Sequence, residues 1–235
     1  MKQSGVNGSG FIPIQNATLT RDQMEALIAQ GQAPRVFEDC CFDEADFSRL
    51  DLRGFVFRQC SAVETSWYAA TLAETQWHKC RGRQADFEAT DLAGAEFVNC
   101  DWNNTNWRRS KQSSVSFADC KLTGANFEGV TGLGLEFSDC LLVGADLRGM
   151  SFRKGRLIGL DFSDADISGG DFREAEFIGG SLRNVHAKLT RFDGADLRET
   201  NIDGLQVLDA KLFRKALISP QQAAALLSAW GLIVA

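Results

Sequence analysis

The sequence has few tyrosines, histidines and prolines, and it has no long apolar segment. Its 235 residues include one tyrosine, two histidines and three prolines. No run of about 18 apolar residues is present, and the N-terminus lacks the charged-then-apolar pattern of a signal peptide. We therefore expect no membrane span and a cytoplasmic location, a reducing compartment in which unpaired cysteines are common.

The cysteines, by contrast, are numerous and regularly spaced. Six of the seven recur at a constant interval of twenty residues: Cys40, Cys60, Cys80, Cys100, Cys120 and Cys140. A fixed interval in sequence corresponds to a fixed advance in space, as in chains that wind into a coil. The sequence thus predicts a solenoid with twenty residues in each turn.

The twenty-residue interval divides into four fives. From Phe37 to Leu212, every fifth residue falls in one register without insertion or deletion, and nearly all of these residues are large and apolar. The exceptions are Ala62, Gly82, Gln112, Gly132 and Ala187. An α-helix repeats its apolar face every 3.6 residues or so and a strand every two, so neither explains a period of five. We predict a four-sided all-β solenoid of about nine coils.

Each five-residue unit also has a regular internal pattern. The residue two before the large apolar one is usually small or a cysteine, and both should face the core because they point the same way in extended chain. The residue between them is often Asp or Asn, whose short side chain can bond nearby backbone at a corner. Glycine ends many units, for example at Gly94, Gly124 and Gly144, where we expect a turn with positive φ.

The units follow the pattern Ala-Asp/Asn-Leu/Phe-x-x, and the sequence resembles the pentapeptide repeat family. Clear copies are ADFSR, ADFEA, ANFEG, ADLRG, ADISG and ADLRE, at residues 45–49, 85–89, 125–129, 145–149, 165–169 and 195–199. The resemblance implies a right-handed quadrilateral β-helix, which we place at residues 35–216. It implies much less about function, because one fold serves many unrelated roles.

Both ends of an open solenoid need caps, since each exposes apolar core and unpaired strand edges. Residues 1–16 are rich in Gly, Ser and Asn, which predicts a flexible arm. Residues 17–34 are predicted to hold a short capping helix, because Thr20 and Gln23 match a capping box.

At the other end, residues 217–235 are predicted to form a helix that starts near Ser219-Pro220-Gln221-Gln222, followed by an apolar strand at residues 232–235. This segment can fold back over the last coil as a cap. It also resembles the C-terminal dimerisation module of quinolone-resistance and topoisomerase-modulating pentapeptide proteins, and the two arrangements are compatible. The resemblance implies an end-to-end homodimer with the interface residues Leu226, Leu227, Trp230, Leu232, Ile233 and Val234.

No motif for catalysis, a cofactor or a metal is found. His78 and His186 occupy outward positions on different sides of the coil, without a partner suggested by the sequence. The aspartates recur at the spacing of the repeat, which favours turns over acid–base chemistry. A metal needs ligands that converge on a point, whereas a column of cysteines spreads them along a line, so we interpret the thiols as small apolar core groups. We therefore predict a protein that is not an enzyme and has no cofactor.

Function is then expected on the outer surface, where the four sides differ in charge. The side through Phe37 is the most acidic, and the side through Leu52 is slightly basic. Outward apolar residues also stack on one side of the coil, as at Ile158 and Ile178. The candidate partner-binding surface consists of Glu96, Asp119, Glu136, Asp139, Ile158, Glu176 and Ile178.

Two functional hypotheses remain open, and both are non-enzymatic. The resemblance at the C-terminus implies a dimeric mimic of duplex DNA that binds DNA gyrase or another type II topoisomerase. Alternatively, LTRDQMEALIAQG at residues 19–31 resembles the start of pentapeptide domains associated with type VI secretion systems, which implies a protein–protein adaptor or accessory module. Direct nucleic-acid binding is not expected, because the net charge is −6 and no basic stripe with aromatics is present.

Overall fold

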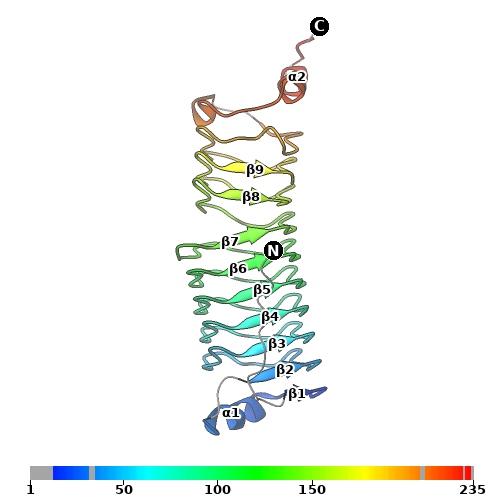
Figure 1. Ribbon diagram of the computed structural model, residues 1–235, viewed down its shortest axis with the longest axis vertical. Helices are drawn as coiled ribbons and strands as arrows, with labels where there is room; N and C mark the ends of the chain where they lie inside the picture. The colour runs from blue at the N-terminus through cyan, green and yellow to red at the C-terminus, as the bar shows by residue number, and fades with distance from the viewer. Residues whose placement is uncertain (1–12, 32–34, 207–209, 230, 234–235) are drawn as a thin grey trace, which may run out of the picture.

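A computed structural model describes residues 13–31, 35–206, 210–229 and 231–233 of the chain. Over these residues, nine short strands form one parallel sheet in sequence order along an elongated rod (Figure 1). The strands are β1 (Ile14–Gln15), β2 (Val36–Glu38), β3 (Val56–Arg58), β4 (Gln76–His78), β5 (Glu96–Val98), β6 (Ser116–Ala118), β7 (Glu136–Ser138), β8 (Arg156–Ile158) and β9 (Glu176–Ile178). From β2 to β9 they recur every twenty residues and mark eight turns, so the predicted β-solenoid is confirmed at close to the expected length.

On the other three sides, most turns pair with the next turn through single bridges. One such set joins residues twenty apart: Cys41 with Ser61, Asp46 with Ser66 and Asp51 with Thr71. Backbone hydrogen bonds follow the same interval, as from the Phe47 N–H to the Ser66 carbonyl at 2.8 Å. The cross-section is therefore four-sided, as the division of twenty into fives predicts.

The core is a column of large side chains supplied by all four sides. Phe37, Phe42, Phe47 and Leu52, one from each side of the first turn, are fully buried. Rings twenty residues apart stack face to face, for example Phe57 on Trp77 with centroids 3.9 Å apart. Such stacking lets neighbouring turns bury aromatic area without a gap, which is where most of the fold's stabilisation arises.

The corners carry positive φ angles at the last position of nearly every described unit, as predicted for Gly94, Gly124 and Gly144 (φ of 72°, 68° and 62°). Many residues other than glycine share this conformation, among them Glu44 and Arg49. The Asp and Asn residues act as predicted: the Asp46 carboxylate accepts the Ser48 N–H at 2.8 Å, and other units repeat this turn two residues on. Together these features turn the chain by a quarter at every fifth residue.

Helix α1 (Arg21–Ala29) caps the first turn. Its predicted capping box is present at Thr20 and Gln23, and Met24 is fully buried in the core. The Arg21 guanidinium donates to the carbonyls of Asp46 and Ser48, at 3.0 and 3.2 Å, which would otherwise face the end of the rod.

The predicted flexible arm is wrong for its last residues. Ile14–Gln15 form β1 and pair in parallel with Phe37 and Glu38, which satisfies the edge of β2 that would otherwise be open. Residues 1–12 of that predicted arm lie outside the described residues.

The last turn departs from the predicted register. The Phe192 N–H bonds the Leu212 carbonyl, one residue further along than the equivalent bond from Phe172 to Arg191. The ring that stacks on Phe192 is consequently Phe213, at 4.9 Å, and not the side chain of Leu212. One extra residue has entered the chain after Leu205, and the short 3₁₀ helix η1 (Ala210–Phe213) replaces a normal corner.

Helix α2 (Pro220–Ala229) follows, as predicted. Ser219 and Gln222 form its capping box, and the Gln222 amide also donates to the carbonyls of Leu197 and Thr200, at 2.7 and 2.8 Å. Beyond the end of the helix at Ala229, Gly231 adopts a φ of 79°, and the Leu232 N–H bonds the Leu227 carbonyl. Leu232 and Ile233 pair with no strand edge within the described residues of the single chain, and residues 234–235 lie outside the description, so the terminal strand stays a prediction.

Candidate protein-binding surfaces

The structure brings most of the predicted partner-binding residues onto one side of the rod, the side that carries the β-sheet. The five residues that lie on strands are Glu96 on β5, Glu136 on β7, Ile158 on β8, and Glu176 and Ile178 on β9. Asp119 and Asp139 sit at the next corner, in equivalent positions one turn apart, with φ of 54° and 51°. Because successive strands are about 4.8 Å apart, these groups form rows that run along the rod axis.

The acidic groups on this side differ in whether they have a partner. Glu176 forms an ion pair with Arg156, at 3.2 Å, and thus adds little to the field around the rod. Among the described residues, the following carboxylates form no side-chain hydrogen bond or ion pair: Glu96, Asp119, Glu136 and Asp139. All four are exposed, so their charges face solvent without local compensation. We call these four residues the acidic row.

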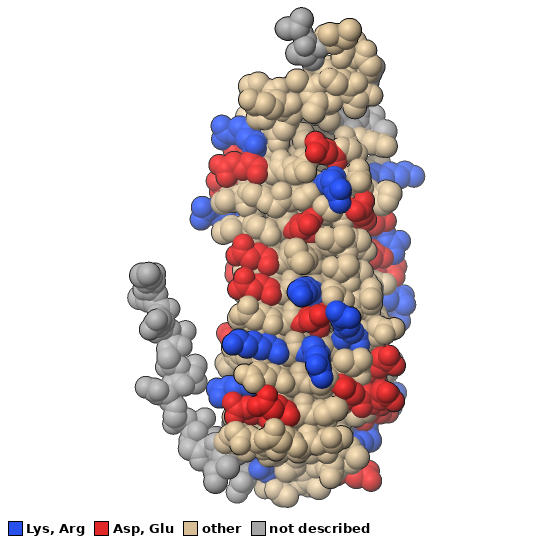
Figure 2. Space-filling view, turned by 90° about the vertical axis from the view of Figure 1, so that its right-hand side faces the viewer, with Lys and Arg blue, Asp and Glu red and all other residues tan. Residues whose placement is uncertain are grey.

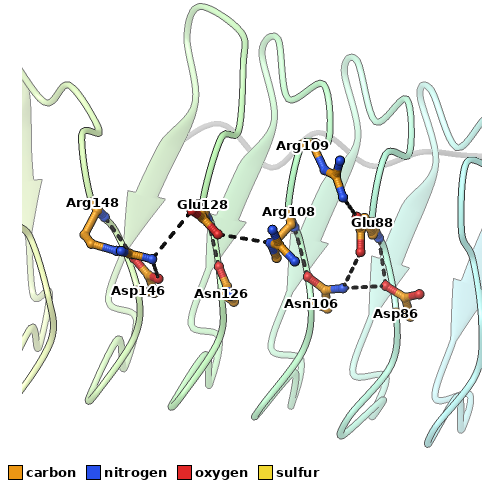
Figure 3. A network of polar contacts seen from close by, with 9 residues as sticks. All are labelled: Asp86, Glu88, Asn106, Arg108, Arg109, Asn126, Glu128, Asp146 and Arg148. Atoms are coloured by element: carbon orange, nitrogen blue, oxygen red, sulfur yellow. Dashed lines mark hydrogen bonds and ion pairs between the residues drawn. The ribbon is translucent and has the colours of Figure 1, made fainter.

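The side through Phe47 is also rich in charge, but its groups neutralise one another (Figure 3). Glu88, Arg108, Glu128 and Arg148 alternate in sign at twenty-residue steps. Arg108 pairs with Glu128 at 3.1 Å, and Arg148 lies 3.7 Å from Glu128 on the other side. A hydrogen bond from Asn106 and then the contact with Arg109 lower the pKa of Glu88. These ion pairs link neighbouring turns, and the four residues that alternate in sign carry no net charge.

The C-terminal cap is a surface of a different kind. From residue 216 to the end of the sequence there is no charged side chain. In Figure 2 the cap at one end of the rod accordingly shows neither the blue of Lys and Arg nor the red of Asp and Glu. Leu226 and Leu227 of α2 line an apolar cavity of about 300 Å³ against Leu197, Leu205 and Phe213. Leu232 is 53% and Ile233 95% exposed, whereas the predicted interface residues Trp230 and Val234 lie outside the described residues.

A third feature is an interruption of the ladder between β7 and β8, visible in Figure 1 as a wider separation of these strands. Only Ser138 and Ile158 pair here, whereas β6 and β7 share three residue pairs. On the neighbouring side, Ser151 pairs with Asp171 in the following turn, but the described residues contain no bridge between Ser151 and Thr131.

Gly132 explains the interruption. It occupies an inward position without a side chain, its φ is 143°, and an added Cβ would lie 2.5 Å from the Ser113 nitrogen. The turn therefore rests against the turn before it and withdraws from the one after. A groove of about 500 Å³ opens at this point, lined by residues of β6, β7 and β8. The only sign of this interruption in the sequence was a glycine at a repeat position where most other units have a large apolar residue.

The cysteine column lies inside the core, as predicted, and all seven cysteines are free. The Cys140 thiol lies 3.4 Å from the Phe117 carbonyl and 3.2 Å from the Ser138 carbonyl. Burial raises the pKa of Cys80, and the neighbouring Cys120 together with burial raises the pKa of Cys140, so these two thiols stay protonated and unreactive.

The structure also bears on the remaining sequence predictions. Burial lowers the pKa of His78, and the nearby Arg58 lowers it further, so this histidine is neutral at physiological pH. Within the described ranges, no group of three or more His, Cys, Asp or Glu is placed to hold a metal ion. No helix among them is long and apolar enough to cross a membrane.

Comparison with known proteins places the fold. The chain is similar to QnrB1, a plasmid-mediated fluoroquinolone resistance protein, with 19% identity and a TM-score of 0.58 over 83% of this chain and 97% of that one, in a trypsin-treated form. It is also similar to HetL, a pentapeptide repeat protein involved in heterocyst differentiation regulation from the cyanobacterium Nostoc sp. strain PCC 7120, with 15% identity and a TM-score of 0.47 over 84% and 94% of the two chains. No curated protein matches the sequence.

Two family models match the coiled part of the chain. The pentapeptide repeat region model matches residues 36–107 and 56–127, and the model of pentapeptide repeats in eight copies matches residues 134–169 and 170–204. The short stretch between them includes Gly132, where the ladder is interrupted. Since the matches extend over most of the solenoid and agree with its five-residue register, the chain belongs to the pentapeptide repeat family.

Proposed function

We propose that this protein is a non-enzymatic rod that binds another protein through its outer surface, and that its partner is DNA gyrase or a related type II topoisomerase, which it engages as a mimic of duplex DNA. The observation that carries the proposal is the acidic row: exposed, unpaired carboxylates held at the regular step of a parallel sheet. Duplex DNA likewise presents negative charge at a constant spacing along its axis. QnrB1, which has a similar fold, is a fluoroquinolone resistance protein, and this guides the choice of enzyme.

The arrangement of charge suits a surface that is recognised by its field. Elsewhere on the rod, ion pairs such as those of the Phe47 side cancel neighbouring charges. The uncompensated carboxylates of the acidic row are thus positioned to steer a positively charged protein groove toward one side of the rod. A rigid, repetitive backbone keeps these groups in place, so little ordering entropy is lost on binding.

The second part of the proposal is an end-to-end homodimer through the C-terminal cap. Two copies that meet through α2 and the exposed Leu232 and Ile233 would bury apolar surface that one chain leaves in water. The absence of charge from residue 216 onward removes any like-charge repulsion across a two-fold axis. Such a dimer would be a longer rod, with its acidic rows related by symmetry, which suits a two-fold enzyme.

A gyrase supercoiling assay tests the proposal. We expect the purified protein, titrated against gyrase with and without a fluoroquinolone, to inhibit supercoiling or protect the enzyme from the drug at sub-micromolar concentration. The variant Asp119→Asn/Glu136→Gln/Asp139→Asn should lose this effect. The matched control Glu44→Gln/Glu64→Gln/Asp203→Asn changes three exposed carboxylates on another side and should retain it. No effect of the native protein at a large molar excess over gyrase would reject the topoisomerase as partner.

A second candidate function, a protein–protein adaptor, is favoured by the interruption between β7 and β8. A mimic of a uniform rod has no need of a groove, whereas an adaptor needs a place at which a partner chain can dock. If the supercoiling assay shows no effect, the adaptor becomes the leading proposal.

A further inference from the structure

The interruption leaves backbone groups unpaired on both of its edges. The amide N–H groups of Gly132 and Gly134 on one edge, and of Ser151 and Arg156 on the other, donate to no group among the described residues. One turn earlier, the equivalent groups are paired, because the Gln112 N–H bonds Thr131 at 2.7 Å and the Ser114 N–H bonds Leu133 at 2.8 Å. Unpaired edges in register with a sheet are templates for a further extended chain.

Unpaired carbonyl groups lie along the same edge as the unpaired N–H groups. In the described chain, the carbonyls of Val130 and Leu135 accept no backbone hydrogen bond. These two carbonyls lie at the two ends of the stretch that holds the free N–H groups of Gly132 and Gly134. Along residues 130–135 the free groups are thus, in order, one carbonyl, two N–H groups and one carbonyl, so this edge offers both donors and acceptors to an incoming extended backbone. We call residues 130–136 and 150–156 the interrupted edge.

The groove at the interrupted edge is also apolar. Its lining includes Leu135, Phe137, Phe152 and Leu157, which belong to the core or pack against it. Leu133 stands at the same edge and is 87% exposed, although it is large and apolar. An extended chain with an apolar residue at every second position would place those residues into the groove.

The charge of the groove selects among such chains. On the lip formed by residues 150–156, Glu174 lies 3.3 Å from Arg153 and 3.7 Å from Lys154, and Arg156 is held by the ion pair with Glu176. On the other lip, Glu136 lines the groove and has no partner, and Asp139, which is likewise unpaired, lies on the same turn. The uncompensated charge on the lip formed by residues 130–136, to which an extended chain would pair, is therefore negative.

From this geometry we propose that the interrupted edge binds an extended, basic segment of a partner protein by strand addition. Alternate apolar residues of the segment enter the groove, its backbone pairs with residues 130–136, and its Lys or Arg side chains meet Glu136 and Asp139. The inference rests on the proposed function only in that the partner is a protein. It adds that the partner has an extended basic segment, and binding of the rod as a DNA mimic would not need such a segment.

Fluorescence anisotropy with designed peptides tests the proposal. The probe is a labelled, end-capped eight-residue peptide of alternating Lys and Val, and its comparators are the same peptide with Glu in place of Lys and the Lys–Val peptide N-methylated at alternate residues. We expect the Lys–Val peptide to bind the full-length protein, and each comparator to bind about tenfold or more weakly, since one loses charge attraction and the other loses several hydrogen bonds. Hydrogen exchange in the complex should slow at Gly132 and Gly134, whose N–H groups lie on the edge to which the peptide pairs.

Variants separate this site from general attraction to an acidic rod. Glu136→Gln/Asp139→Asn should weaken binding of the Lys–Val peptide, whereas Glu44→Gln/Glu64→Gln, which removes the same number of exposed charges on another side, should not. Equal binding of all peptides, equal loss in both variants, protection elsewhere on the rod, or no binding would each overturn the proposal. Gyrase inhibition without peptide binding would reject this inference alone. Peptide binding without an effect on gyrase would reject the topoisomerase and keep the interrupted edge.

Discussion

At the scale of single residues, several inward positions are matched to their neighbours in the core. The Trp77 indole donates to the Thr75 hydroxyl at 3.0 Å, and Trp107 donates to Thr105 at 2.6 Å, so a buried N–H is satisfied by the small residue two positions before it. Gly82 has no side chain, and the Trp102 ring of the next turn occupies the space that a side chain would need. An added Cβ there would lie 1.9 Å from the indole of Trp102 in the next turn.

Gly82 gives a direct test of this matching. Gly82→Ala should lower the free energy of unfolding by about 1–3 kcal/mol, because the methyl group would overlap the Trp102 ring. In a Trp102→Leu background the same change should have a much smaller cost, since the smaller side chain leaves room. Urea unfolding of the four proteins of this cycle measures the coupling. An equal cost of Gly82→Ala in both backgrounds would contradict the assigned contact.

The sequence predicts the inward residues well and the corners only in part. The period of five alone identifies residues such as Phe37 and Leu52 as core, because burial of large apolar groups follows directly from it. Glycine marks some positive-φ corners, but Asp39, Glu44 and Arg49 adopt φ of 53°, 59° and 62° without any such signal. There the paired turns on either side impose the conformation and offset its local cost of about 1 kcal/mol.

At the scale of elements, the turns carry titratable groups on which stability depends. The pKa of Asp146 is lowered, first by hydrogen bonds from the Arg148 side chain and then by the Arg148 backbone N–H, against the opposing effect of partial burial. The same Asp-x-Arg arrangement, with the same leading cause, lowers the pKa of Asp51, Asp171 and Asp196. Each of these groups is thus more acidic in the folded protein than in the unfolded chain.

This predicts a defined response to acid. Because the folded pKa lies below the unfolded value of about 3.9, each pair stabilises the fold fully above that pH and loses its contribution as pH falls through the folded pKa. We expect the free energy of unfolding to be nearly level from neutral pH to about pH 4 and to fall steeply below it. Urea unfolding at a series of pH values measures this, and Asp146→Asn should show a shallower acid decline than the native protein. Identical acid profiles would contradict the role of Asp146.

Elements were predictable where a local signal exists and not where the cause is three-dimensional. The capping boxes at Thr20 and Ser219 are local, and both helices begin where predicted. The strand β1 was missed because its two residues lie beside a Gly/Ser-rich segment, and only pairing with β2 makes them a strand. The interruption at Gly132 could not be predicted from the sequence, because two inward glycines behave differently. Trp102 fills the space beside Gly82, whereas no side chain among the described residues fills the space beside Gly132.

At the scale of the whole molecule, the rod presents an acidic side, a neutralised side and an uncharged end. The uncharged end predicts self-association, and Ile233→Asp tests it, since this residue is 95% exposed and its replacement should leave the single chain folded. Light scattering after size exclusion should give twice 25.8 kDa for the native protein and 25.8 kDa for Ile233→Asp. Leu141→Asp, at a residue 42% exposed on another side, should remain dimeric. A monomeric native protein would contradict the dimer.

The central proposal is that the acidic row takes the place of DNA on a type II topoisomerase. The most direct measurement is competition, in which the protein is titrated into a complex of gyrase and a fluorescent DNA duplex and the anisotropy of the duplex is followed. The account predicts full displacement of the duplex by the native protein, and displacement by Asp119→Asn/Glu136→Gln/Asp139→Asn only at concentrations at least about tenfold higher. A duplex that stays bound, or equal displacement by both proteins, would contradict it.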